Sequence, residues 1–156
     1  MTLDVLVGCA ALVRDAAGRY LLVQESKVSA RGRYNLPAGR LARDETLTEA
    51  AVREAREETG LHVAIENVVG FYHCPRTSEG FAVLNVVFAA HAVGGSLVTS
   101  DEHPDVRFFY RDEIADLQLR LLLRGTHIPL AIEDHERGQR LPLSVVQVVA
   151  ASPLPH

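Results

Sequence analysis

Two apolar, valine-rich runs near the start of the chain predict β-strands. Residues 3–13 form a nearly uninterrupted apolar run, and residues 20–25 form another after the polar turn at residues 15–18. Runs of this length between turn residues are typical of strands, and a run without polar alternation indicates a strand that is buried on both faces. We therefore expect a β-hairpin whose first strand is buried on both faces.

Helical spacing replaces this pattern at residues 47–59. Thr46 and Glu49 match the T-x-x-E capping box that begins a helix, and Gly60 stands where a C-terminal helix glycine belongs. One side of the predicted helix is apolar and mostly small, with Leu47, Ala51, Val52 and Ala55. Such a stripe lets a helix lie close on a sheet. The sequence therefore predicts a helix that is packed on one side and polar on the other.

The remaining elements alternate between strand and helix patterns. Residues 62–73 and 81–93 predict an antiparallel pair around a turn at residues 77–80. Further expected elements are short strands at residues 34–36 and 106–110, helical segments within residues 111–125 and 127–138, and a last strand at residues 143–150. Pro129 is expected in the first turn of the second of these helices. Mixed strands with helices predict an α/β sandwich, and because no repeat or linker divides the chain, residues 1–156 are expected to form a single domain.

Composition narrows the class of protein. With 47% hydrophobic and 23% charged residues, the chain matches a globular protein. Its net charge of -4 and its scattered basic residues argue against binding to long nucleic acids, so a nucleotide ligand would be small. Asp4 stands where a signal peptide would be basic, and no apolar stretch is long enough to span a bilayer. The chain has two cysteines, Cys9 and Cys74, which are too few for a disulfide framework. We therefore expect the protein to work in the reducing environment of the cytoplasm.

Acidic residues gather at the end of the predicted helix. Glu54 lies one helical turn from both Glu57 and Glu58, so the three carboxylates share a face and repel one another. Arg53 can reach Glu57, but one guanidinium does not neutralise three carboxylates. A hard divalent cation would, and oxygen ligands favour Mg²⁺, for which Mn²⁺ can substitute. Because Mg²⁺ pairs naturally with phosphates, the cluster points to hydrolysis at phosphorus.

The same segment resembles the Nudix signature, G-x(5)-E-x(7)-R-E-U-x-E-E-x-G-U, in which U is a bulky aliphatic residue. Matching positions run through residues 39–61 and comprise Gly39, Glu45, Arg53, Glu54, Glu57, Glu58, Gly60 and Leu61. Ala55 departs from the signature where a bulkier aliphatic residue is usual, which we interpret as an altered core contact. The preceding loop also departs from the common W-x-x-P-G-G, with Tyr34 and Ala38 in place of the tryptophan and the first glycine.

The resemblance implies a fold and a set of roles. The fold would be a Nudix-type α/β/α sandwich with a mixed sheet over nearly the whole chain. The Gly39 carbonyl and the carboxylates of Glu54, Glu57 and Glu58 would hold the metal, Arg53 would orient a glutamate, and Glu45 would anchor the loop to the helix. In some Nudix enzymes a loop glutamate six residues before a strand aromatic is a metal ligand or general base. Glu102 stands six residues before Phe108 and could take either role, unless it belongs to a solvated acidic turn with Asp101 and Asp105.

Candidate substrate contacts lie in the loop before the signature. Arg33 and Arg40 flank it, and an arginine fork suits phosphate oxygens. With aromatic residues scarce and tryptophan absent, base stacking would fall to a residue such as Tyr34, Tyr72 or Phe81. None of the seven histidines has a metal-ligand spacing with another, so all are expected to be packed or solvated.

The sequence thus predicts a Mg²⁺-dependent hydrolase of nucleoside di- or triphosphates or related pyrophosphates. The lead-in loop and residues 137–143 resemble a branch of nucleoside diphosphatases and broad nucleotide phosphatases. One alternative is an ADP-ribose or sugar-nucleotide pyrophosphatase, which Pro75 weakly favours. An isoprenoid diphosphate isomerase would need an active-site cysteine, and a non-catalytic nucleotide-binding module would normally lack some signature acids. The oligomeric state stays open, with a homodimer as one alternative.

Overall fold

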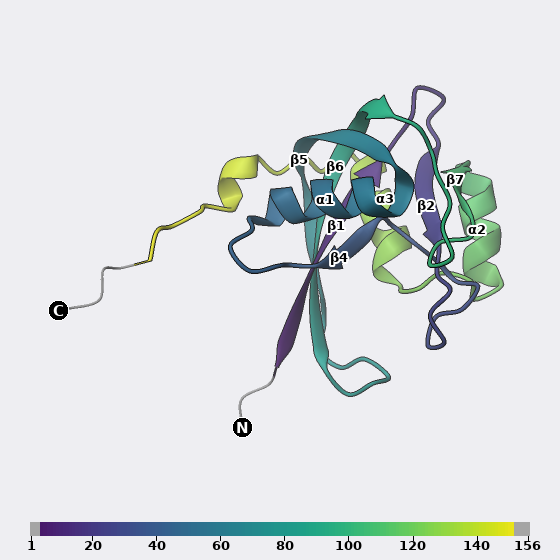
Figure 1. Ribbon diagram of the computed structural model, residues 1–156, viewed down its shortest axis with the longest axis horizontal. Helices are drawn as coiled ribbons and strands as arrows, with labels where there is room; N and C mark the ends of the chain where they lie inside the picture. Colours follow the sequence, from purple (N-terminus) through teal and green to yellow (C-terminus); the bar gives the residue numbers. More distant parts are fainter. Residues whose placement is uncertain (1–3, 152–156) are drawn as a thin grey trace.

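Two β-sheets and three α-helices build the computed structural model, which describes residues 4–151 (Figure 1). The larger sheet has the order β4-β1-β6-β5, with β1 at Val5–Val13, β4 at Ala38–Arg40, β5 at Leu61–Cys74 and β6 at Ala82–Gly95. Strands β1 and β6 are parallel and the other neighbours are antiparallel, so this sheet is mixed, as expected. The smaller sheet has the order β3-β2-β7, with β2 at Tyr20–Gln24, β3 at Tyr34–Asn35 and β7 at Val106–Phe109.

The predicted hairpin between the first two strands is wrong. Strand β1 belongs to the larger sheet and β2 to the smaller one, and a single bridge between Arg14 and Tyr20 joins them. The reason is that β6 occupies one edge of β1 along its whole length and β4 occupies the other edge at Gly8–Ala10, where a longer hairpin would have to pair. Burial was predicted correctly for the second half of β1, where residues 9–13 are fully buried, whereas its first half is partly exposed. Residue 3, the expected first position of the strand, lies outside the described residues.

Helix α1, Leu47–Thr59, begins and ends where the sequence predicts. Thr46 accepts a hydrogen bond from the backbone N–H of Glu49, and the Glu49 carboxylate accepts one from the N–H of Thr46, which completes the capping box. Gly60 ends the helix in the left-handed conformation at φ 79°, where a residue with a Cβ would be strained. Ala55 is fully buried in a cluster with Val13 and Val63, so the small residue permits close packing of helix and sheet.

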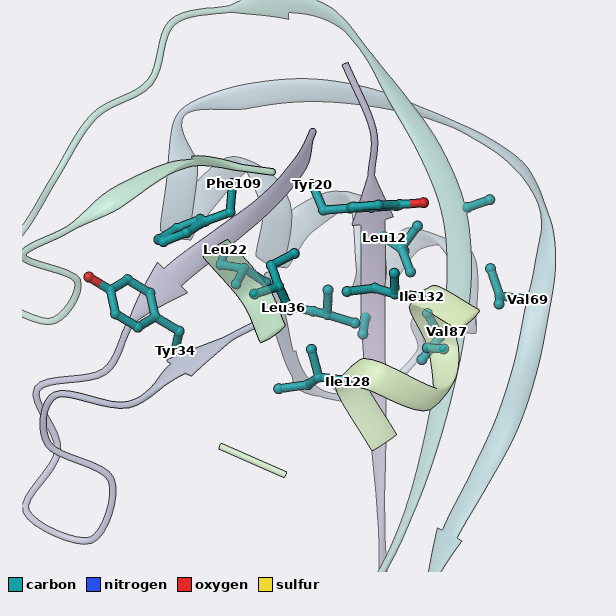
Figure 2. Close-up of a cluster of buried hydrophobic side chains, with 14 of the residues drawn as sticks. Leu12, Tyr20, Leu22, Tyr34, Leu36, Val69, Val87, Phe109, Ile128 and Ile132 are labelled. Atoms are coloured by element: carbon teal, nitrogen blue, oxygen red, sulfur yellow. The ribbon is translucent and has the colours of Figure 1, made fainter. Parts of the chain in front are cut away.

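The main core fills the opposite side of the larger sheet, between it, the smaller sheet and two helices. These helices are α2, Arg111–Leu119, and α3, His127–Glu136, which has Pro129 in its first turn as expected. Figure 2 shows the side chains that meet there, including Leu12, Tyr20, Leu36, Val87 and Ile132. With α1 on one side of the larger sheet and this core and α3 on the other, the layers of an α/β/α sandwich are complete.

The predicted last strand at residues 143–150 is wrong. Residues Leu143–Val145 form a single 3₁₀ turn, η1, and residues 146–151 have no regular secondary structure. Leu141 pairs antiparallel with Val68 of β5, but Pro142 follows it and has no N–H with which to continue a ladder. The apolar, β-branched composition therefore did not produce a strand. A bilayer-spanning helix is not found in residues 4–151.

Candidate active site

Arg53, on the polar side of α1, is the centre of the signature cluster. Its Nε lies 2.6 Å from one oxygen of Glu45 and its Nη2 lies 3.0 Å from the other, a two-pronged contact between guanidinium and carboxylate. Its Nη1 donates to Glu54 at 2.7 Å and to Glu57 at 3.2 Å. Nη2 also donates to the backbone carbonyl of Arg40 at 3.2 Å. Arg53 therefore ties the loop after β4 to two of the three helix carboxylates, and Glu45 has the anchoring position that we expected.

Gly39 and Glu54 meet where β4 passes over α1. Gly39 pairs with Cys9 of β1, and a Cβ added at position 39 would overlap the carboxylate of Glu54. Only glycine lets the backbone come this close to a carboxylate. The structure thus brings together the backbone of Gly39 and the Glu54 side chain, which is 14% exposed.

Glu58 lies deeper than its two companions. Its carboxylate accepts a hydrogen bond from the backbone N–H of Ala38 at 3.1 Å, and its other oxygen lies 3.5 Å from Nε2 of His103. Burial disfavours the charged carboxylate and raises the pKa of Glu58 to about 9, although the N–H of Ala38 favours the charge. A cation beside this side chain would restore its charge.

His103 is the residue that sequence reasoning missed. It is 6% exposed, and its Nδ1 lies 3.1 Å from the backbone carbonyl of Gln24 while Nε2 faces Glu58. The partners are 79 and 45 positions away in the chain, so no local spacing could have indicated the contact. The loop before β7 therefore does reach the signature helix, and the residue that it places there is a histidine.

Glu57 and Glu102 are more exposed. The Glu57 side chain is 59% exposed, and Arg53 is its ion-pair partner. Glu102 is exposed, its backbone carbonyl accepts a hydrogen bond from Ser26 at 3.1 Å, and its carboxylate has no hydrogen-bond partner within residues 4–151. Because His103 follows it directly, Glu102 lies one residue from a contact with the acidic cluster. Its role as a ligand or base stays a prediction.

The acidic cluster suits a metal by its chemistry. Within the described part of the chain, no three or more His, Cys, Asp or Glu side chains are arranged to hold an ion, because Arg53 and Ala38 hold the glutamates in separate hydrogen bonds. The available donors are nevertheless all oxygens, from Gly39, Glu54, Glu57 and Glu58. Oxygen donors are what Mg²⁺ prefers, so the chemistry of the donor set fits that ion.

Of the expected substrate contacts, Tyr34 is contradicted by the structure. It is 8% exposed, its ring packs edge-on against Phe109, and its hydroxyl donates to Asp105 at 2.5 Å, so no face is free to stack on a base (Figure 2). The same bond shows that Asp105 is not part of a merely solvated turn. Arg40 is exposed, and its backbone carbonyl accepts a hydrogen bond from Arg53. Arg33 is exposed and lines a cavity.

That cavity is about 640 Å³, within the range of small-molecule sites. Its walls come from the loop around β3, the outer ends of β5 and β6 with the turn between them, and the start of α3. Asn85 on its floor lies in register with Gly8 of β1, which on its other side is in register with Arg40 of β4. The cavity therefore lies two strands away from β4, the strand that carries Gly39.

Comparison with known proteins relates this geometry to a family. A family model described as NUDIX domain matches residues 5–128. The phosphatase NudJ of Escherichia coli K12 is 30% identical over 139 residues, which cover 87% of each chain. An ADP-ribose pyrophosphatase of Methanocaldococcus jannaschii is 33% identical over 58% of this chain, and human 8-oxo-dGDP phosphatase NUDT18 is 42% identical over 53% of it. The match spans only 54% and 24% of the length of these two relatives.

A solved structure agrees over nearly the whole chain. A NUDIX hydrolase from Nitrosomonas europaea superposes with a TM-score of 0.86 at 30% identity, covering 94% of this chain and 98% of its own. The expected sandwich fold is thereby confirmed.

Proposed function

The chain belongs to the Nudix family, and from this membership and its site we propose that it is a Mg²⁺-dependent hydrolase of phosphoanhydride bonds in nucleoside di- or triphosphates or related pyrophosphates. The observation that carries the proposal is the contact of the Gly39 backbone with the Glu54 carboxylate. This carboxylate also accepts a hydrogen bond from Arg53, and Glu58 bonds to the backbone N–H of Ala38, next to Gly39. Oxygen donors gathered against an open backbone fit a hard cation that also binds phosphate.

In this proposal Gly39, Glu54, Glu57 and Glu58 would hold Mg²⁺, with Glu102 as a further ligand, and Mn²⁺ can substitute. The bound metal would lower the pKa of a water molecule and neutralise charge on the phosphate oxygens. Family members generally use divalent metals, and the chemistry of these donors is in keeping with that.

The remaining work falls to side chains of this chain. The oxygen of a water molecule would form a bond to one phosphorus as the bond from that phosphorus to the bridging oxygen breaks. A carboxylate, Glu54 or Glu102, would accept the proton of the attacking water. Arg53 would act as a positioning residue, because it binds Glu45 and Glu54 at once. Arg33, just before β3, and Arg40, at the end of β4, are exposed and would approach the phosphates.

A pyrophosphatase of ADP-ribose is the second candidate, and the similarity to the archaeal ADP-ribose pyrophosphatase favours it. The isomerase alternative is weakened because Cys9 is fully buried and burial raises the pKa of its thiol to about 11, which makes it a poor proton donor to a substrate. Cys74 is exposed but lies in β5, outside the acidic cluster.

We also propose that residues 1–156 form a single domain and that the protein works in a reducing cytoplasm. Ile132 of α3 is fully buried in the main core, which makes that helix part of the same body, and Cys9 and Cys74 are free thiols. A homodimer is also proposed, to be measured by the molar mass in solution.

Incubation of the protein with a panel of nucleotides and pyrophosphates tests the function. With Mg²⁺ present, we expect a nucleoside di- or triphosphate to release phosphate or pyrophosphate, identified by product mass. Appearance of a nucleoside monophosphate with a sugar phosphate would instead establish the ADP-ribose alternative. Absence of any cleavage with either Mg²⁺ or Mn²⁺ would refute the proposal.

Magnesium is expected to stabilise the fold. A ligand that binds only the folded state adds RT ln(1 + [Mg²⁺]/Kd), which is about 1.4 kcal/mol at tenfold saturation. The melting temperature should therefore rise with millimolar Mg²⁺ or Mn²⁺ in differential scanning fluorimetry. A melting temperature that responds to neither ion would argue against a metal site at the acidic cluster.

Glu102→Gln tests the loop carboxylate. If Glu102 binds the metal or accepts the proton, its amide should lower kcat at least about tenfold, since a positioned base contributes roughly 10² to 10⁴ in rate. The melting temperature should change little, because the carboxylate is exposed and unbonded among residues 4–151. Asp101→Asn, an exposed neighbour, is the matched control. Asp105 is unsuitable for that purpose, because it binds the Tyr34 hydroxyl. Equal turnover in both variants would leave Glu54 as the base.

A further inference from the structure

Three arginines without a carboxylate partner line the cavity beside β3, β5, β6 and α3. Arg33 precedes β3, Arg76 lies in the turn between β5 and β6, and Arg124 precedes α3. None of the three guanidinium groups has an ion pair or hydrogen bond to another residue of the described chain, whereas Arg53 and Arg111 both bind carboxylates. The cavity therefore gathers three guanidinium groups from separate segments, and none of them is paired with a carboxylate.

The start of helix α3 adds to the positive potential at the cavity. Helix α3 has ten residues and begins at the cavity wall, and its N-cap residue Thr126 makes no side-chain cap, so the positive end of the helix dipole is uncompensated there. Glu79 is the single acidic residue among the lining residues.

The charge at the cavity wall stays positive near neutral pH. His127 contributes no further charge, since burial and the neighbouring Arg124 lower its pKa to about 4. Three arginines against one glutamate leave an excess of two positive charges around the lining. A neutral base or sugar would leave this excess uncompensated, whereas phosphate and carboxylate oxygens match the arginine fork.

The cavity lies within reach of the proposed reaction centre. Asn85 of β6, Gly8 of β1 and Arg40 of β4 are in register on three adjacent strands, so Asn85 at the cavity and β4 are about two strand spacings apart, roughly 10 Å. The cavity lies on the α3 side of the sheet and Glu54 on the α1 side, so a substrate would contact both by passing around β4, which is an edge strand of the sheet. A Cβ at Gly8 would lie 2.6 Å from the Asn85 side-chain oxygen, so the glycine keeps room for Asn85 beside the cavity.

We infer that this cavity binds a second anionic group of the substrate, so that the preferred substrates are diphosphates with a further phosphate or carboxylate away from the scissile bond. The inference rests on the proposed function for the identity of the scissile group. The walls formed by Phe71, Phe81 and Leu130 would contact the carbon atoms of the connecting sugar or base.

Isothermal titration calorimetry in EDTA tests the inference without catalysis. Two probe pairs differ by one anion: adenosine 3′,5′-bisphosphate against adenosine 5′-monophosphate, and UDP-glucuronate against UDP-glucose. We expect at least tenfold tighter binding of the more anionic member in one pair, and the pair that responds tells phosphate from carboxylate. A preference below tenfold in both pairs, or no binding of any probe at millimolar concentration, overturns the inference.

Two arginine variants assign the preference to the cavity. Arg124→Gln should reduce it at least threefold, whereas Arg31→Gln, an exposed arginine outside the cavity, should retain it. Equal weakening of both members of a pair by Arg124→Gln would mean that Arg124 holds the shared phosphate, which also overturns the inference. Hydrolysis with Mg²⁺ is measured in parallel. Cleavage without the binding preference would refute only this inference, and the preference without cleavage would refute the proposed function.

Discussion

Replacing Glu57 by glutamine should lower kcat by about 10² or more at saturating Mg²⁺. The change keeps the shape of the side chain and removes the negative charge that we propose as a metal ligand. Because the side chain is 59% exposed and its ion pair with Arg53 is a solvated one, the melting temperature in EDTA should hardly move. The variant therefore separates a catalytic contribution from a structural one.

The measurement is steady-state turnover at several Mg²⁺ concentrations, together with nucleotide binding in EDTA. Glu66→Gln is the matched control, since Glu66 is an exposed glutamate of β5 that pairs with His91 of β6. Nucleotide binding should survive in both variants. Turnover of Glu57→Gln within a factor of two of the unaltered protein would refute the assignment of Glu57 as a ligand.

Local signals in the sequence were sufficient for the helix that carries the site. The capping box of Thr46 and Glu49 and the left-handed Gly60 act within a few residues, so both helix ends could be predicted from spacing alone. The i,i+3 and i,i+4 steps likewise placed Glu54, Glu57 and Glu58 near one another. Their distinct surroundings could not be predicted in this way, because burial depends on what packs over each side chain.

Features that depend on distant partners were missed or mistaken. The hairpin failed because β4 and β6 compete for the edges of β1, and the last strand failed because Pro142 interrupts its pairing with β5. The burial of Tyr34 follows from Phe109 and Asp105, more than 70 residues away. These contacts depend on the topology of the fold, which the local composition does not determine.

His103 shows the same limit within the site itself. The spacing to a strand aromatic predicts a role for Glu102, but the loop buries the next residue against Glu58. Residues 100–103 form a turn in which Ser100 and His103 hydrogen-bond to each other, and within this turn Glu102 is exposed while His103 is buried. A motif spacing can place a loop at a site without telling which of its side chains enters.

Glu58→Gln should have opposite effects on stability and on catalysis. In the folded protein the pKa of Glu58 is raised to about 9 from an ordinary value of 4.5, chiefly by burial. Between these two values the folded state keeps the proton and the unfolded state loses it, so the free energy of unfolding falls as pH rises, by up to about 1.4 kcal/mol per pH unit. The stability that the protonated carboxyl contributes is fully present below pH 4.5 and is lost as the pH rises through 9.

A glutamine has no proton to lose and can still accept the hydrogen bond from Ala38, so in EDTA the variant should equal the unaltered protein near pH 5 and exceed its melting temperature at pH 8.5. Addition of Mg²⁺ at pH 8.5 should reverse the order, because the cation stabilises the ionised carboxylate and gains little from the amide. The loss of a ligand should also lower kcat by about 10² or more. The melting temperatures of both proteins are measured by calorimetry with and without Mg²⁺, and they test two statements separately. Identical pH dependence of both proteins in EDTA would show that Glu58 ionises as it does in water, and equal stabilisation of both by Mg²⁺ would remove Glu58 from the proposed ligands.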